Sequence, residues 1–126
     1  MKLSAETIAK MQTVINAVLA QPEYYDQEMF PYDRDSECGT ICCGAGWAVW
    51  VDSPARYKYL LRRRRAHWSS EANKILGIKS GDKLFYSSDY WPDKYRMAYR
   101  RANTPKQRAR AMADRWNHYI ATDGAE

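Results

Sequence analysis

Three cysteines, Cys38, Cys42 and Cys43, are the residues of this chain best suited to covalent chemistry. They stand in the run 38–51, which carries no charge and has the composition of a buried helix. A thiol in the first turn of a helix lies near unsatisfied N–H groups and the positive end of the helix dipole, and both favour the thiolate. Cys42 or Cys43 could therefore act as a nucleophile if a base lies nearby.

A base for such a thiol would have to be His67 or His118. Asp114 precedes His118 by four residues, so on a helix its carboxylate would lie on the same side and could orient the imidazole. However, the chain has no local motif of a known Cys–His enzyme. Cys43 also shares a helical face with Trp47, which favours a buried structural thiol. The sequence therefore favours a protein that is not an enzyme, with no assigned catalytic residue.

A metal site could also be assembled from the three cysteines and His118. Zinc requires four protein ligands, or three with an open position. Adjacent Cys42 and Cys43 would point about 100° apart on a helix, which suits a single ion poorly. We therefore expect neither a bound metal nor a cofactor, and a thiol or metal site at Cys38, Cys42, Cys43 and His118 is kept only as an alternative.

Cationic side chains gather in the second half of the chain. Residues 1–53 carry three Lys or Arg against eight Asp or Glu, and residues 54–126 carry 17 against seven, so a net charge of −5 is followed by +10. Such a basic half can form a face that binds an acidic partner, or it can pack on the acidic half within one fold. The predicted binding residues are Arg62, Arg63, Arg65, Arg96, Arg100, Arg101, Arg108 and Arg115.

Length and cysteine usage limit the class of protein. The 126 residues suit one domain, 1–126, with a single core. An odd number of cysteines and the lack of a secretory leader predict a reducing cytoplasm. The uncharged run is too short to cross a bilayer. We therefore expect a cytoplasmic protein without a membrane partner.

The uncharged run also carries a family resemblance. Cys38-Gly39-Thr40, then Cys43, then Ala45-Gly46-Trp47-Ala48 is similar to the signature of a family of small uncharacterised bacterial and bacteriophage proteins. That family brings no established activity, so the resemblance implies a bacterial host cell but no reaction. Cys42 and Gly44 depart from the pattern, and any role shared by the family would belong to Cys38 and Cys43. The family's later landmarks resemble Leu76-Gly77-Ile78, Leu84-Phe85, Trp91-Pro92 and the segment 118–124.

Helical periodicity and capping residues predict the elements that must position these groups. A first helix starts after Ser4 and stops before Pro22, and an acidic, aromatic strap, 22–37, connects it to a central helix, 42–51. With no convincing strand pattern, the prediction is an all-α fold, a single compact domain of about five to seven helices around a buried central helix. A further helix is expected to start at Pro54, and another to run from Ser69 or Ser70 to a left-handed stop at Gly77. One helical turn should precede Leu84 and Phe85, and a helix should include Tyr95, Tyr99 and Ala102. The last helix should start at Asn103 or Thr104 and end near Gly124.

Arg64 is predicted to be buried. On a helix that starts at Pro54 and continues past residue 64, it projects between Leu60 and Leu61, in one stripe with Tyr57 and Trp68. A buried charge needs a partner, so we expect a strap carboxylate to pair with Arg64. The candidate carboxylates are Glu23, Asp26, Glu28, Asp33, Asp35 and Glu37, and the other residues with an expected structural role are Cys38, Cys43, Trp47, Trp50 and Trp116.

These patterns predict a small basic binding module of phage or prokaryotic origin. It would dock on an acidic host protein or nucleoprotein, as an inhibitor does, because Arg, Tyr and Trp are the residues most enriched at interface hot spots. The alternative is a nucleic-acid-binding protein that meets phosphates with Arg and Lys and stacks Tyr and Trp on exposed bases. The chain has no base-reading motif, so such binding would weaken steeply with salt.

Overall fold

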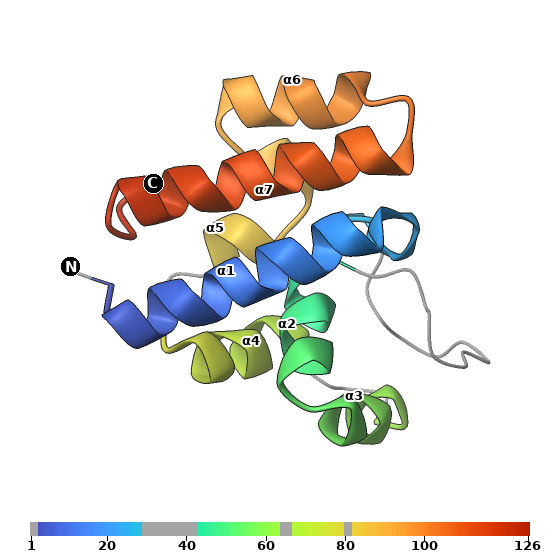
Figure 1. The fold of residues 1–126 in the computed structure, drawn as a ribbon, viewed down its shortest axis with the longest axis vertical. Coiled ribbons are helices and arrows are strands. Elements are labelled where there is room, and N and C mark those ends of the chain that lie inside the picture. The colour runs from blue at the N-terminus through green and yellow to red at the C-terminus, as the bar shows by residue number, and fades with distance from the viewer. Residues whose placement is uncertain (1–2, 29–42, 64–66, 80–81) are drawn as a thin grey trace.

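The computed structural model describes residues 3–28, 43–63, 67–79 and 82–126 (Figure 1). Within these ranges the chain forms seven α-helices, two short 3-10 helices and no strand, which confirms the predicted all-α fold. None of the described helices has the length and hydropathy that crossing a membrane requires. The elements are α1 (Ala5–Ala20), η1 (Pro22–Tyr24), α2 (Gly44–Asp52), α3 (Pro54–Leu61), α4 (Trp68–Leu76), α5 (Asp82–Phe85), η2 (Ser88–Tyr90), α6 (Asp93–Arg101) and α7 (Pro105–Ala121).

Side-chain caps set several of the helix starts. Ser4, Ser53 and Thr104 each accept a hydrogen bond from the backbone N–H three residues further on, as the sequence predicted. Gly77 ends α4 in the left-handed conformation, with φ of 76°. The predicted serine cap of α4 is wrong, because the helix starts earlier and its N-cap is His67.

The predicted central helix is α2. It contacts α1, α3 and α4, and its residues from Gly44 to Val49 are all buried. The helix begins later than predicted, because Cys43 is its N-cap. A Cβ on Gly44 would lie 2.9 Å from Trp116 Cζ2, so a larger residue would displace the Trp116 ring. This close approach of Gly44 to Trp116 accounts for a glycine at this position.

Helices α1 and α7 form the long seam of the molecule. They run antiparallel in contact, with α6 on the outer side of α7 and with α2, α3 and α4 on the other side of α1 (Figure 1). The Leu3 N–H donates to Asp123 Oδ1 at 2.8 Å, which ties the start of α1 to the end of α7. The side chains of Met11 and Val18 on α1 and of Trp116 on α7 are fully buried.

Helix α3 ends before Arg64. The helix ends at Leu61 with Arg62 as its C-cap, and Trp68 begins a separate helix. The helical projection that placed Arg64 between Leu60 and Leu61 therefore does not apply. Arg64 itself and Arg65 lie outside the described residues.

The described start of the strap, residues 22–28, packs on the core. The Trp47 Nε1–H donates to the Tyr24 carbonyl oxygen at 3.0 Å. Gln27 is 2% exposed, and its side-chain amide donates to the carbonyl oxygens of Leu84 at 3.0 Å and Tyr86 at 2.7 Å. Its Oε1 accepts from the Tyr25 hydroxyl at 2.7 Å. Three of the six carboxylates that were proposed to pair with Arg64 lie outside the described residues. They are Asp33, Asp35 and Glu37.

Candidate functional site

Cys43 does not have the environment of a nucleophile. Its side chain is fully buried, as predicted. Burial raises the pKa of the Cys43 thiol, and this effect outweighs the opposing hydrogen bonds from the backbone N–H groups of Gly46 and Ala45. The alternative of a helix-stabilised thiolate is therefore disfavoured at Cys43, and Cys38 and Cys42 lie outside the described residues.

The predicted Asp114–His118 arrangement does not form. Asp114 Oδ1 lies 3.5 Å from Arg110 Nε instead. His118 packs on the Tyr95 ring, with 5.2 Å between ring centroids, and its Nε2 lies 3.6 Å from Glu126 Oε2. In the described part of the chain, no group of three or more His, Cys, Asp or Glu is placed to hold a metal ion.

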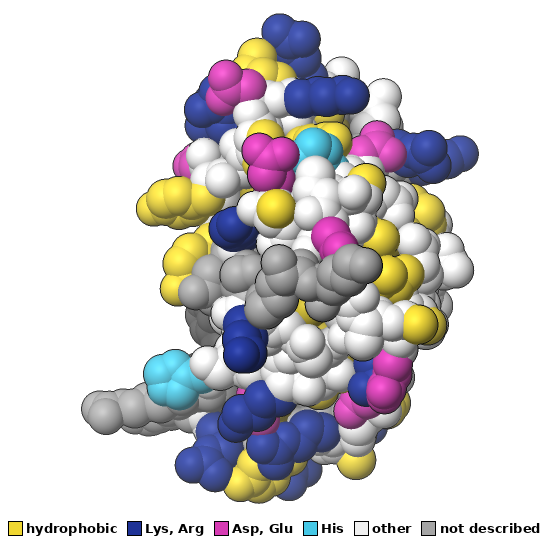
Figure 2. Space-filling view, turned by 90° about the vertical axis from the view of Figure 1, so that its left-hand side faces the viewer, with side chains coloured by type: hydrophobic (Ala, Val, Ile, Leu, Met, Phe, Trp, Pro, Cys, Tyr) yellow, Lys and Arg dark blue, Asp and Glu magenta, His cyan; other side chains and the backbone are white. Residues whose placement is uncertain are grey.

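The predicted binding arginines divide between two ends of the molecule. Arg62 and Arg63 are exposed at the end of α3, and a second group lies on α6 and α7 at the opposite end in Figure 1. Figure 2 shows Lys and Arg side chains gathered toward both ends, with acidic side chains among those at the α6 end. The second group consists of Arg96, Arg100, Arg101 and Arg108.

Carboxylates pair with two of the four arginines at the α6 end. Arg96 Nη2 lies 2.7 Å from Asp93 Oδ1, and Arg100 forms a hydrogen-bonded ion pair with Asp89. Exposed pairs of this kind contribute little stability, but they reduce the local field that an acidic partner would meet.

Arg115 was predicted to bind a partner, and this prediction is wrong. Its side chain is 1% exposed. Among the described residues, Arg115 Nε and Nη1 have no hydrogen-bond partner, and Nη2 lies 3.5 Å from the Lys83 carbonyl oxygen. Burial lowers the pKa of the guanidinium, although the group stays charged through the neutral range.

Replacing Arg115 by methionine should raise the free energy of unfolding by about 2 kcal/mol, because an apolar side chain of similar length removes a buried charge with poor compensation. Urea denaturation of both proteins measures the change. The matched control is Arg110→Met on the same helix, where an exposed side chain is changed and the effect should stay within about 0.5 kcal/mol. A loss of stability in Arg115→Met would contradict the prediction.

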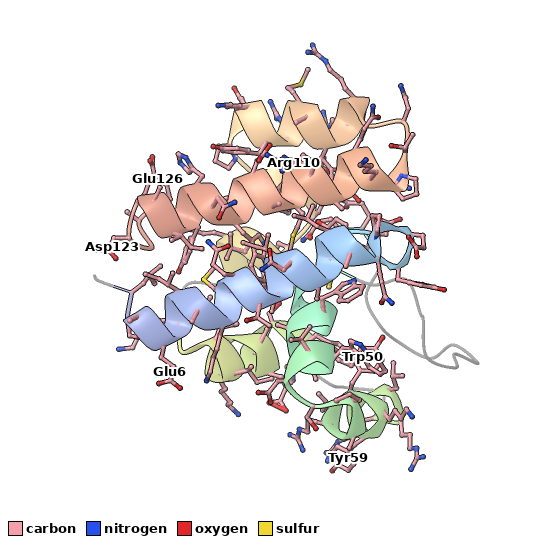
Figure 3. All side chains as sticks on the ribbon, in the orientation of Figure 1. Glu6, Trp50, Tyr59, Arg110, Asp123 and Glu126 are labelled. Atoms are coloured by element: carbon pink, nitrogen blue, oxygen red, sulfur yellow. The ribbon has the colours of Figure 1, made fainter. Side chains whose placement is uncertain are left out.

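A pocket of about 470 Å³ lies between α3 and α4, and we call it the α3–α4 pocket. Both helices pack on α2, which brings their side chains together. Tyr59 projects outward from α3 at the end of the molecule remote from α7 (Figure 3). The pocket is lined by the cations Arg56, Arg63 and Lys74 and by Tyr59, Leu60, His67, Ser70 and Glu71.

Two arginines flank the Tyr59 ring, which is 45% exposed. Arg56 Cζ lies 5.1 Å and Arg63 Cζ 5.6 Å from the ring centroid. Arg63 Nη1 also donates to the Tyr59 hydroxyl oxygen at 2.6 Å. The ring therefore attracts both guanidinium groups, which line the pocket, by cation–π interaction.

One carboxylate, Glu71, lines the described pocket. Its Oε1 accepts a short hydrogen bond from Arg56 Nη2, and its Oε2 lies 3.9 Å from Lys74 Nζ. Three permanent cations thus surround one anion, so the pocket keeps an excess of positive charge at neutral pH. Such a site can hold an anionic group, and its aromatic wall can contact a flat ring.

Sequence reasoning named Arg63 and His67 of this pocket but missed Arg56, Tyr59 and Lys74. The spacing of Arg56, Tyr59 and Arg63, three and then four residues, was a usable signal, because it places side chains on one helical face. The approach of Lys74 depends on how α3 and α4 pack, which no local pattern contains.

No family model, curated protein or solved structure matches the chain. The family resemblance at residues 38–48 therefore stays a prediction.

Proposed function

We propose that this protein is a binding module that docks on an acidic protein or nucleoprotein through the α3–α4 end. The observation that carries the proposal is the excess of cations around the exposed Tyr59 ring in the α3–α4 pocket. Lys58 and Arg62 are also exposed on and beside α3, so they add to the positive charge of this end of the molecule. Such a surface would speed the encounter with an acidic partner and fix its orientation.

The composition of this end also supports docking. Arg and Tyr are enriched at the hot spots of protein interfaces, because each joins a large contact area to hydrogen-bond donors. The guanidinium groups of Arg56 and Arg63 are held against the Tyr59 ring before any partner arrives. These two arginine side chains would therefore lose less entropy when a partner binds than freely moving arginines would.

Charge reversal at the α3–α4 end should weaken the binding of the acidic partner. We expect the double variant Arg62→Glu/Arg63→Glu to retain roughly tenfold less acidic partner than the wild type, because both cations are exposed and the partner would meet repulsion in their place. The measurement is quantitative co-purification with the tagged full chain from its native cell, with stepwise elution by salt.

The matched control is Arg101→Glu/Lys106→Glu. It makes the same change in net charge at exposed residues of the α6 end and should retain the partner. Equal loss of the partner in both double variants would show that only total charge matters, and equal retention would place docking elsewhere. Either result would overturn the proposed function.

A further inference from the structure

We infer that the α3–α4 pocket takes a nucleotide unit of single-stranded nucleic acid, with a phosphate beside Arg63 and Lys74 and the base against Tyr59. The inference rests on the proposed function and narrows the acidic partner to the nucleic-acid strand of a nucleoprotein. Four observations carry it: the donors around Arg63, the neutralised carboxylate, the exposed ring and the size of the pocket.

Arg63 is the donor best placed for a phosphate. It forms no ion pair with any described residue, and its side chain hydrogen-bonds to the Tyr59 hydroxyl oxygen at 2.6 Å. Because that oxygen accepts from Arg63, the Tyr59 O–H can itself be donated to a ligand oxygen. A guanidinium presents five N–H donors in a planar fork that fits two phosphate oxygens. Ser70 and His67 line the same pocket and can add donors.

The carboxylate of Glu71 does not oppose an anion in this pocket. Glu71 is largely buried, with 16% of its side chain exposed. Its two oxygens face Arg56 and Lys74, as described above. The charge of Glu71 is thus matched inside the protein, and the charge of Arg63 is left for a ligand. A phosphate would find a net attractive site.

The exposed Tyr59 ring favours a nucleotide over an acidic peptide. A carboxylate side chain gains nothing from a π-face, whereas a base stacks on an aromatic ring with about 1–3 kcal/mol per base. A volume of about 470 Å³ is within the range of pockets that hold small organic ligands. In a duplex the faces of the bases are already stacked, so the ring favours a single strand.

The cations around the pocket favour a strand over a free nucleotide. Lys58 and Arg62 are exposed on and just after α3, outside the pocket lining. A single phosphate in the pocket would not reach them, whereas a strand that passes around α3 would carry further phosphates to them. Each added contact with a phosphate releases counterions and makes the affinity depend more steeply on salt.

Fluorescence anisotropy with a labelled oligothymidylate of about ten nucleotides tests the inference on the full chain. We expect Tyr59→Leu to weaken binding of the strand about tenfold, because the stacking surface is lost. Tyr59→Phe keeps the ring and should stay within about twofold. The matched control is Tyr90→Leu, an exposed tyrosine, 73% accessible, near the other end of the molecule, which should leave the affinity unchanged. Arg63→Gln should flatten the slope of log affinity against log salt by about 0.7.

Two competitor probes separate the alternatives: a duplex and an oligoglutamate peptide, each of similar charge. We expect both to bind about tenfold more weakly than the strand and to be unaffected by Tyr59→Leu. Equal strand affinity in Tyr59→Leu and Tyr90→Leu would overturn the inference, as would a peptide or duplex that binds as tightly as the strand. The proposed function would survive those results if charge reversal at Arg62 and Arg63 still abolished binding. Failure of the wild type to bind any of the three probes in low salt would overturn both.

Discussion

Replacing Trp116 by alanine should lower the free energy of unfolding by about 4 kcal/mol. The ring is fully buried in the C-terminal half of α7. It packs on Phe85 of α5, with 5.8 Å between ring centroids, and it lies against Gly44 of α2. A cavity at this point would remove contacts from three helices together, and the close backbone around Gly44 limits how far the core could collapse to fill it. Urea denaturation followed by circular dichroism measures the change.

Trp50→Ala is the matched control for Trp116→Ala. Trp50 is only partly buried on α2, and its ring meets Tyr57 edge to face with 5.4 Å between centroids. We expect a loss of about 1–2 kcal/mol there, because part of the ring already faces water. Equal losses at the two positions would contradict the central role of Trp116.

Gln27→Ala should cost about 3 kcal/mol of unfolding free energy, which is large for a polar side chain. The variant would leave the carbonyl oxygens of Leu84 and Tyr86 without their amide donor. It would also leave the buried Tyr25 hydroxyl without its acceptor. Unsatisfied buried groups carry the full cost of desolvation. Thermal and urea denaturation should agree on the loss.

Gln12→Ala supplies the comparison for Gln27→Ala. The Gln12 amide makes one exposed hydrogen bond, to Asn117 Oδ1 at 3.1 Å, so its loss should stay within about 0.5 kcal/mol. If the two glutamine variants were equally stable, the hydrogen bonds of Gln27 would not be what holds the strap on the core.

Local signals in the sequence sufficed for most of the fold. Ser4, Ser53 and Thr104 are cap residues whose side chains satisfy their own helix, and Gly77 supplies a conformation that other residues rarely adopt. These features depend on neighbours within a few residues. They could therefore be predicted without knowledge of the packing.

The burial of Arg115 could not be predicted in the same way. The apolar stripe of α7 through Met112 and Trp116 indicated one buried face. However, α7 packs on both α1 and α6, and Tyr95 of α6 contacts His118 on a second side. The sequence gives no sign of that second buried face, because charged residues lie on it. Only the placement of α6 reveals which arginine is withdrawn from water.

Only part of the candidate site could be predicted, because its residues come from two helices. Arg62 and Arg63 stood out because four arginines are adjacent. The pocket also needs Glu71 and Lys74, which come from α4 and reach α3 only because both helices pack on α2. Projection of a single long helix through this region failed, since α3 ends at Leu61. Contacts between elements decide the site, and sequence periodicity describes only one element at a time.

The seam between α1 and α7 has a consequence for the order of folding. The hydrogen bond from Leu3 to Asp123 joins residues 120 positions apart, whereas α6 and α7 are neighbours in sequence and contact each other directly. Closing a loop of that length costs about 2 kcal/mol more entropy than closing one of ten residues. We therefore expect the α6–α7 hairpin to form early during refolding and the α1–α7 seam to close late, so that this long-range step limits the folding rate.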